Sequence, residues 1–86
     1  MAFTPDVWNQ IKNVSADQLK KALERDGFAC EGKRGAVLGF FKQGPPRRRV
    51  TIHYHPGKTY QPKLLHALIA EAGWAVDDLR RLKLIK

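Results

Sequence analysis

The stretch that decides the fold is Arg48-Arg49-Val50-Thr51-Ile52-His53-Tyr54-His55. Its side chains alternate in character, so that one set is apolar (Val50, Ile52 and Tyr54) and the other is polar (Arg49, Thr51, His53 and His55). Successive side chains of a β-strand point to opposite faces. The pattern therefore predicts a strand with an apolar face against helices and an open face of basic and histidine side chains.

Two helices are expected before this strand. Thr4 is placed to cap a short helix that starts at Pro5 and packs on the body of the protein through an apolar stripe. Residues 15–18 have the Ser-x-x-Gln form of a capping box. The helix that follows is expected to run to about Asp26 and to stop at Gly27.

The middle of the chain predicts three consecutive strands. Residues 28–31 have the pattern of a first strand, and the two glycines of 32–35 suit a turn. Residues 36–42 have high β-propensity and form the second strand, which Gly44-Pro45-Pro46 should break. Short connections between successive strands predict an antiparallel meander.

The C-terminal part is expected to be helical. Pro62 suits the first turn of a helix that ends at Ala72 and is closed by Gly73. Its expected buried stripe is Leu64, Leu65, Leu68, Ile69 and Ala72. A final short helix is expected over 76–82, and the apolar residues at the C-terminus either fold back onto the domain or serve a partner.

These elements predict an α+β domain in the order α-α-β-β-β-α-α, with helices packed on one face of a three-stranded antiparallel sheet. At 86 residues the chain should be one domain, with its core over about 14–74 and helical extensions at 1–13 and 75–86. The lone Cys30 excludes an intramolecular disulfide and is expected to be a small core residue. No apolar run is long enough for a signal peptide or a membrane span, so we expect a cytoplasmic protein.

The net charge of +8 is concentrated in the predicted sheet and its loops. Residues 32–70 hold eight basic residues and no acidic one, whereas the two flanks together hold eight of each. A one-sided basic surface is typical of proteins that bind nucleic acid. The alternative is a solvated surface that only keeps the protein dispersed.

Several segments together resemble the HicA (YcfA-like) toxins, the small RNA-cleaving partners of bacterial HicA–HicB toxin–antitoxin pairs. The resemblance runs from about Val14 to Leu82, and four segments carry it: Arg25-Asp26-Gly27-Phe28, Lys33-Arg34-Gly35, the run from Arg49 to Lys58, and the segment from Pro62 to Trp74. It implies a double-stranded-RNA-binding-domain-like fold, mRNA as the substrate and a HicB-like antitoxin as the partner.

One position departs from the pattern of that family. The family usually has Gly-Ser-His after the first strand, and its histidine is regarded as catalytic. The matching positions here are Gly35, Ala36 and Val37. A valine cannot transfer a proton, so either the chain has lost activity or the chemistry has moved elsewhere on the sheet.

Metal-free RNA cleavage needs one group to take a proton from the 2′-hydroxyl and another to give one to the leaving oxygen. Histidine suits both steps because it titrates near neutral pH. His53 and His55 are candidates for these catalytic roles, since a continuous strand would place them on one face about 7 Å apart. Arg49 could bind phosphate. No cofactor is expected.

Other roles for the histidines stay open. His53 could be a polar residue on an exposed sheet face, and His55 could order the loop at Pro56. The sequence supports a zinc site formed by these two with His66 only weakly, because it does not give the orientation of the His66 helix relative to the strand.

The residues expected to contact RNA are Lys33, Arg34, Lys42, Arg47, Arg48, Arg49, Thr51, Lys58 and Lys63. Phe40 and Phe41 must point to opposite faces, so one of them could stack on a base, whereas Tyr54 is expected in the core. Taken with these residues, the resemblance implies an endoribonuclease whose basic face a HicB-like antitoxin covers. The alternatives are an RNA-binding domain without catalysis and a small interaction protein with an acidic partner.

Overall fold

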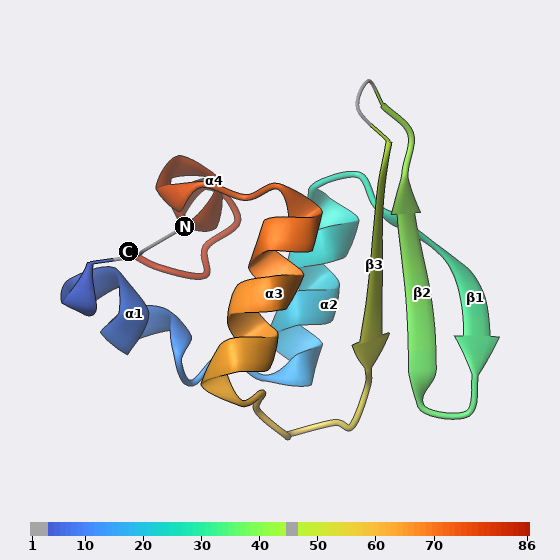
Figure 1. Ribbon diagram of the computed structural model, residues 1–86, viewed down its shortest axis with the longest axis horizontal. Helices are drawn as coiled ribbons and strands as arrows, with labels where there is room; N and C mark the ends of the chain where they lie inside the picture. The colour runs from blue at the N-terminus through green and yellow to red at the C-terminus, as the bar shows by residue number, and fades with distance from the viewer. Residues whose placement is uncertain (1–3, 45–46) are drawn as a thin grey trace.

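The computed structural model describes residues 4–44 and 47–86. Its elements are α1 (Pro5–Ile11), α2 (Ala16–Arg25), β1 (Ala29–Arg34), β2 (Val37–Lys42), β3 (Arg48–His53), α3 (Pro62–Ala72) and α4 (Val76–Arg81). The strands form one antiparallel sheet in the order β1-β2-β3, with α2 and α3 on one side of it and α1 and α4 farther out (Figure 1). The predicted α+β class and the order of the elements are confirmed. Within the described ranges, no helix has the length and apolar character needed to cross a membrane.

The first two helices begin where the capping residues predict. The Thr4 hydroxyl accepts a hydrogen bond from the Val7 N–H, and Pro5 occupies the first helical position. At α2 the Ser15 hydroxyl accepts from the Gln18 N–H, and the Gln18 side chain accepts from the Ser15 N–H at 2.8 Å. This reciprocal pair satisfies two of the N–H groups that a helix start leaves without partners.

The first hairpin differs from the prediction. β1 covers Ala29–Arg34 rather than 28–31, and the turn lies at Gly35 and Ala36 rather than over 32–35. The register between β1 and β2 shifts between Cys30 and Gly32, which is a bulge that lets the strand continue past Glu31. The left-handed backbone of Gly35, with φ of 61°, supplies the tight turn instead.

The other two strands, in contrast, are shorter than predicted. β2 starts at Val37 instead of Ala36, and β3 ends at His53 instead of His55. The chain leaves the sheet there because the loop after β3 is bonded to the start of α2: the Ala16 N–H donates to the Lys58 carbonyl at 2.8 Å. The expected break at Gly44-Pro45-Pro46 lies partly outside the described residues, since 45 and 46 are not among them.

The core lies between the sheet and the helices. Its buried residues include Leu38 and Phe40 from β2, Val50 and Ile52 from β3, and Leu19, Leu23, Leu65, Leu68 and Ile69 from the helices. Leu64, predicted in the stripe of α3, is instead 43% exposed because it lies beside the i, i+3, i+4, i+7 row that begins at Leu65. The tail folds back onto the domain, since Leu82 and Ile85 are buried.

Among residues 4–44 and 47–86, none covers either face of the edge strand β1. All six of its residues are exposed, because the helices pack over β2 and β3 (Figure 1). Cys30 is therefore exposed, and its prediction as a small core residue is wrong. The bulge and the charged residues Lys33 and Arg34 are features that protect an edge strand against pairing with other chains.

The Asp26 carboxylate, just after α2, ties several parts of the fold together. It accepts hydrogen bonds from Trp74 Nε1 at 2.8 Å, Arg81 Nη2 at 2.6 Å and Lys42 Nζ at 3.1 Å, and its side chain is only 7% exposed. Burial alone would raise the pKa of Asp26, but the hydrogen bonds from Trp74, Arg81 and Lys42 together outweigh it and hold the pKa below its ordinary value of 3.8.

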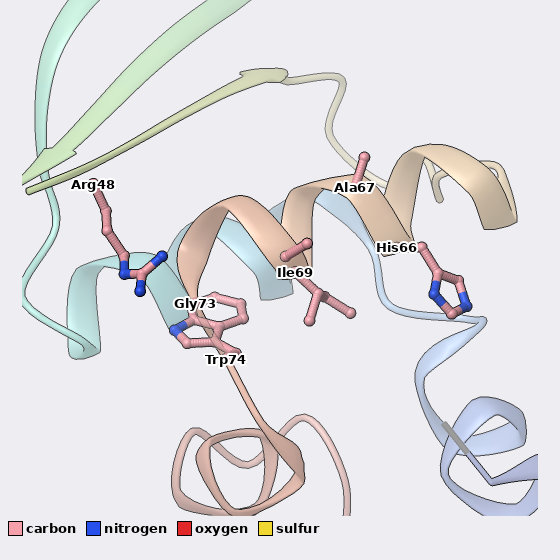
Figure 2. Close-up of a pocket in the computed structure, with 7 residues that line it drawn as sticks. Arg48, His66, Ala67, Ile69, Gly73 and Trp74 are labelled. Atoms are coloured by element: carbon pink, nitrogen blue, oxygen red, sulfur yellow. The ribbon is translucent and has the colours of Figure 1, made fainter. Parts of the chain in front are cut away.

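On the helix side of the sheet, a hollow of about 440 Å³ lies along α3 (Figure 2). Arg48 borders it at one end and His66 at the other, and Gly73 and Trp74 line it between them. The Arg48 guanidinium lies against Gly73, the residue that ends α3 with φ of 76°. A cation is favourable at this position because the last carbonyls of a helix carry partial negative charge.

Replacing Asp26 by Asn should destabilise the fold by about 2 kcal/mol, because two cations and an indole N–H lose a charged acceptor. The control is Asp77→Asn, whose carboxylate is 99% exposed and meets only Arg80 at 3.6 Å. It should change the free energy of unfolding by less than about 0.5 kcal/mol. Urea denaturation of both variants measures the difference.

The same pair tests the pKa of Asp26. A carboxyl with a lowered pKa stabilises the fold above its ordinary value of 3.8, and this contribution is lost as the pH falls through the folded-state pKa. The gap in unfolding free energy between the native chain and Asp26→Asn should thus shrink in acid. A gap that stays constant with pH would contradict the role given to Asp26.

Gly73→Ala should destabilise the fold by about 1–2 kcal/mol, since a residue with a Cβ is strained at this left-handed position. The new Cβ would also collide with the Arg48 guanidinium and displace it from the helix end. Gly32→Ala is the matched control, because Gly32 has no left-handed backbone and nothing within 4 Å of an added Cβ. Equal unfolding free energies for the two variants would count against this description of the α3 terminus.

Candidate nucleic-acid interface

The pairing of the strands fixes which residues share the side of the sheet away from the helices. Residues that pair directly across antiparallel strands lie on the same face. The register therefore defines three rows of an open face, which are Arg34, Val37 and His53; Gly32, Gly39 and Thr51; and Ala29, Phe41 and Arg49. We call these nine residues the open face. The other face of the sheet, toward the helices, carries the buried residues Leu38, Phe40, Val50 and Ile52.

His53 stands directly opposite Val37, the position where the resemblance places the family histidine. The Tyr54 N–H donates to the Ala36 carbonyl at 2.6 Å, which makes Val37 and His53 a pair without hydrogen bonds of its own. In such pairs the side chains are close, with Cβ atoms about 4.5–5.5 Å apart. The exposed imidazole of His53 is thus next to the usual catalytic position, one strand away.

His55 is placed differently from the prediction. It is exposed, but it lies beyond the end of β3, so the spacing of about 7 Å expected for one continuous strand does not apply to His53 and His55. The Asp17 side chain fixes this loop, because it accepts hydrogen bonds from the Tyr54 hydroxyl and from the Gly57 N–H at 3.0 Å.

The contact between Tyr54 and Asp17 also shifts both pKa values. The hydrogen bond from Tyr54, followed by that from the Gly57 N–H, lowers the pKa of Asp17, and the same contact with Asp17 raises the pKa of Tyr54. Tyr54 is half-buried and packs against the edge of the core, as predicted in part, with Lys20 Nζ 5.3 Å from its ring centre. It is therefore a structural residue of the loop, not a surface for bases.

The nine residues expected to contact RNA do not form one surface. Arg34, Arg49 and Thr51 belong to the open face. Lys42 and Arg48 are cross-strand neighbours on the opposite face of the sheet. Lys42 contacts Asp26 there, and Arg48 contacts the end of α3. The remaining ones are exposed at the sheet edge, in the loops and at the start of α3, namely Lys33, Arg47, Lys58 and Lys63.

Two shallow hollows of about 300 and 390 Å³ lie on the open face. Both are lined by Gly32, Gly39 and Thr51, because the middle row has glycine on two of its three strands. Phe41 borders the first hollow and is half-buried, whereas Phe40 is fully buried, which settles which phenylalanine is accessible. Sequence reasoning missed the glycine row. Gly39, in the interior of an apolar strand, was the available signal, since such a glycine often marks close approach of a ligand.

The described residues contain no group of three or more His, Cys, Asp or Glu side chains placed to hold a metal ion. The His66 ring instead stacks on Trp8, with ring centres 4.4 Å apart. The chemistry available on the open face is therefore that of one imidazole, two guanidinium groups, a hydroxyl and an aromatic ring. Imidazole transfers protons, guanidinium groups bind phosphate and aromatic rings stack on bases.

A family model described as the HicA toxin of bacterial toxin–antitoxin systems matches residues 16–74. No curated protein and no solved structure gives a significant match. The matched segment begins with α2, ends just after α3, and includes all three strands and thus the whole open face. Because this match covers more than half of the chain, the protein belongs to the HicA toxin family of bacterial toxin–antitoxin systems.

Proposed function

We propose that this toxin binds RNA on its open face and cleaves it, with His53 as a proton-transfer group. The observation that carries the proposal is the direct pairing of His53 with Val37. A group on the neighbouring strand can reach the space next to position 37, because paired side chains lie about 4.5–5.5 Å apart at their Cβ atoms. The loss of the family histidine is then compensated on the same face of the sheet.

The chemistry follows from the groups that the open face presents. The neutral His53 imidazole accepts the proton of a 2′-hydroxyl, whose oxygen attacks the adjacent phosphorus. The bond from phosphorus to the 5′ oxygen breaks, and that oxygen takes a proton from water or from a second imidazole such as His55. The products are a 2′,3′-cyclic phosphate and a free 5′-hydroxyl, and no external oxidant or co-reactant is needed.

The arginines support this reaction from two places. Arg34 lies in the same row as His53, so its guanidinium can approach the reacting phosphate and stabilise the charge of the phosphorane. Arg49 lies four residues before His53 on β3, about 13 Å away by strand rise, and therefore anchors a neighbouring phosphate. The bound RNA would then run along β3.

The second candidate function is RNA binding without cleavage. It is favoured by the surroundings of His53, since among the described residues no side chain hydrogen-bonds its imidazole, and only its backbone carbonyl has a partner, the Tyr60 hydroxyl at 3.1 Å. Catalytic histidines are usually oriented by a further group. The cleavage assay below separates this candidate from the first.

Membership of a toxin–antitoxin family also implies a protein partner. We propose that a HicB-like antitoxin neutralises the toxin by covering the open face. Acidic groups on the antitoxin would pair with Arg34 and Arg49, so the antitoxin and RNA would compete for the same guanidinium groups.

His53→Ala should lower the rate of RNA cleavage at least about 100-fold, because it removes the general base. The matched control is His66→Ala, which removes a histidine on α3 next to Trp8 and should leave cleavage unchanged. The measurement is the rate of product formation from a labelled single-stranded RNA in the presence of a metal chelator. The double variant with His55→Ala shows whether His55 contributes.

The converse variant, Val37→His, places a second imidazole directly opposite His53 and should raise the cleavage rate. Full cleavage by the His53→Ala, His55→Ala double variant would rule out the proposed catalytic role. RNA binding with no cleavage by the native chain would establish the second candidate.

Arg49→Ala should weaken RNA binding at all sequences and reduce the slope of log affinity against log salt by about one, since one phosphate contact is lost. Its matched control is the adjacent Arg48→Ala, whose side chain lies on the other side of the sheet. Fluorescence anisotropy over a range of salt concentrations measures both slopes. Equal effects of the two variants would show that RNA does not bind the open face.

A further inference from the structure

The middle row of the open face forms a trough across the sheet. Gly32 and Gly39 pair directly, and Thr51 follows on β3, so this row carries only one short side chain, with Glu31 beside it at the bulge of β1. The outer rows are four residues apart along β2 and β3, about 13 Å by strand rise, and five apart along β1, where the bulge adds a residue. The three strands together span about 10 Å. The trough is therefore an unfilled area, about as large as a small molecule, on a sheet whose other positions carry side chains.

One wall of the trough is aromatic. Phe41 belongs to the row next to the trough and is half-buried, with Arg49 beside it on β3. Side chains stand roughly perpendicular to a sheet, so the ring of Phe41 rises beside the glycines. An aromatic face next to an empty glycine floor offers a place for one flat ligand group.

The charges around the trough are not symmetric. Arg49, Thr51 and His53 all lie on β3, whereas Glu31 borders the same hollow from the bulge of β1. At the end of the trough next to Phe41, phosphate is attracted to Arg49 on β3 and repelled by Glu31 on β1, whereas Arg34 borders the trough at its other end. A carboxylate accepts hydrogen bonds, so the edge of a base with its N–H donors suits the side of Glu31.

We propose that the trough is a subsite for one nucleotide of single-stranded RNA. The sugar–phosphate backbone runs along β3, and the base crosses β2 above Gly39, stacks on Phe41 and directs its edge toward Glu31. The proposal rests on the proposed function only in that RNA reaches the open face, and it does not require cleavage.

The subsite discriminates against duplex RNA for a geometric reason. In a helix each base is stacked between neighbours and paired at its edge, so its flat face is not accessible to Phe41. An unpaired nucleotide can turn its base into the trough at no such cost. Base stacking on an aromatic side chain also tolerates different sequences, because every base has an aromatic face.

The test is equilibrium binding of a labelled single-stranded oligoribonucleotide and of a duplex of the same length to the full chain. Both RNAs carry 2′-O-methyl groups, which remove the attacking hydroxyl and so prevent cleavage during the measurement. Gly39→Val fills the trough, while valine is favourable in a strand and an added Cβ meets only the Gly32 backbone at an ordinary 3.8 Å. Cys30→Val is the matched control, since Cys30 pairs with Phe40 and so lies on the other face of the sheet.

We expect the single strand to bind at least about tenfold more tightly than the duplex. Gly39→Val should reduce binding of the single strand about tenfold or more, whereas Cys30→Val should leave it unchanged. If Gly39→Val fails to fold, Phe41→Leu and Phe41→Trp decide the question. The leucine should lose about tenfold in affinity, and the tryptophan should retain it.

Equal affinity for single strand and duplex, or unchanged binding by both Gly39→Val and Phe41→Leu, would overturn the subsite. If those variants bind normally while Arg49→Ala weakens binding and His53→Ala abolishes cleavage, the subsite is wrong and the proposed function stands. Absence of any RNA binding at low salt would overturn both.

Discussion

The Asp26 carboxylate is the contact on which the arrangement of the other parts depends. It joins the end of α2 to β2 through Lys42, to the residue after α3 through Trp74, and to α4 through Arg81. A buried carboxylate without these donors would be costly, so helices and sheet must keep their relative positions for it to remain charged. The same contact also divides the basic residues: Lys42 is used inside the fold, and Arg48, its partner across the strands, lies at the end of α3.

This division explains why the charge of +8 overstates the size of the candidate RNA surface. A run of arginines before and within β3 looks like a single patch in the sequence, but alternation sends Arg48 and Arg49 to opposite sides of the sheet. The open face keeps two arginines, Arg34 and Arg49, and they stand on the two outer strands on either side of the glycine row. The RNA binding proposed for this face therefore depends on shape and stacking as much as on charge.

The parts of the fold that local signals control could be predicted. Capping residues at Thr4 and Ser15 and the stop at Gly73 place three helices, and the two-residue period of β3 correctly separates Val50 and Ile52 from Arg49, Thr51 and His53. The predictions that were wrong concern features that depend on pairing between strands. The bulge at Glu31 moved the turn to Gly35, and Cys30 is exposed because the described helices pack over β2 and β3 and not over β1. Neither the register nor the glycine row can be obtained from one strand alone, because both are properties of the sheet.

The same reasoning bears on the replaced histidine. A residue and its cross-strand partner share one face and nearly one position in space, although sixteen residues separate Val37 from His53 in the chain. A proton-transfer group can thus pass from one strand to the next without change of fold, provided that the pair is one whose side chains are close, as the hydrogen bond from Tyr54 to Ala36 indicates here. In the sequence such a change looks like the loss of a catalytic residue. In the sheet, the role proposed for His53 is a displacement by one strand, and the proposed reacting group stays on the same face as Arg34, Arg49 and the trough.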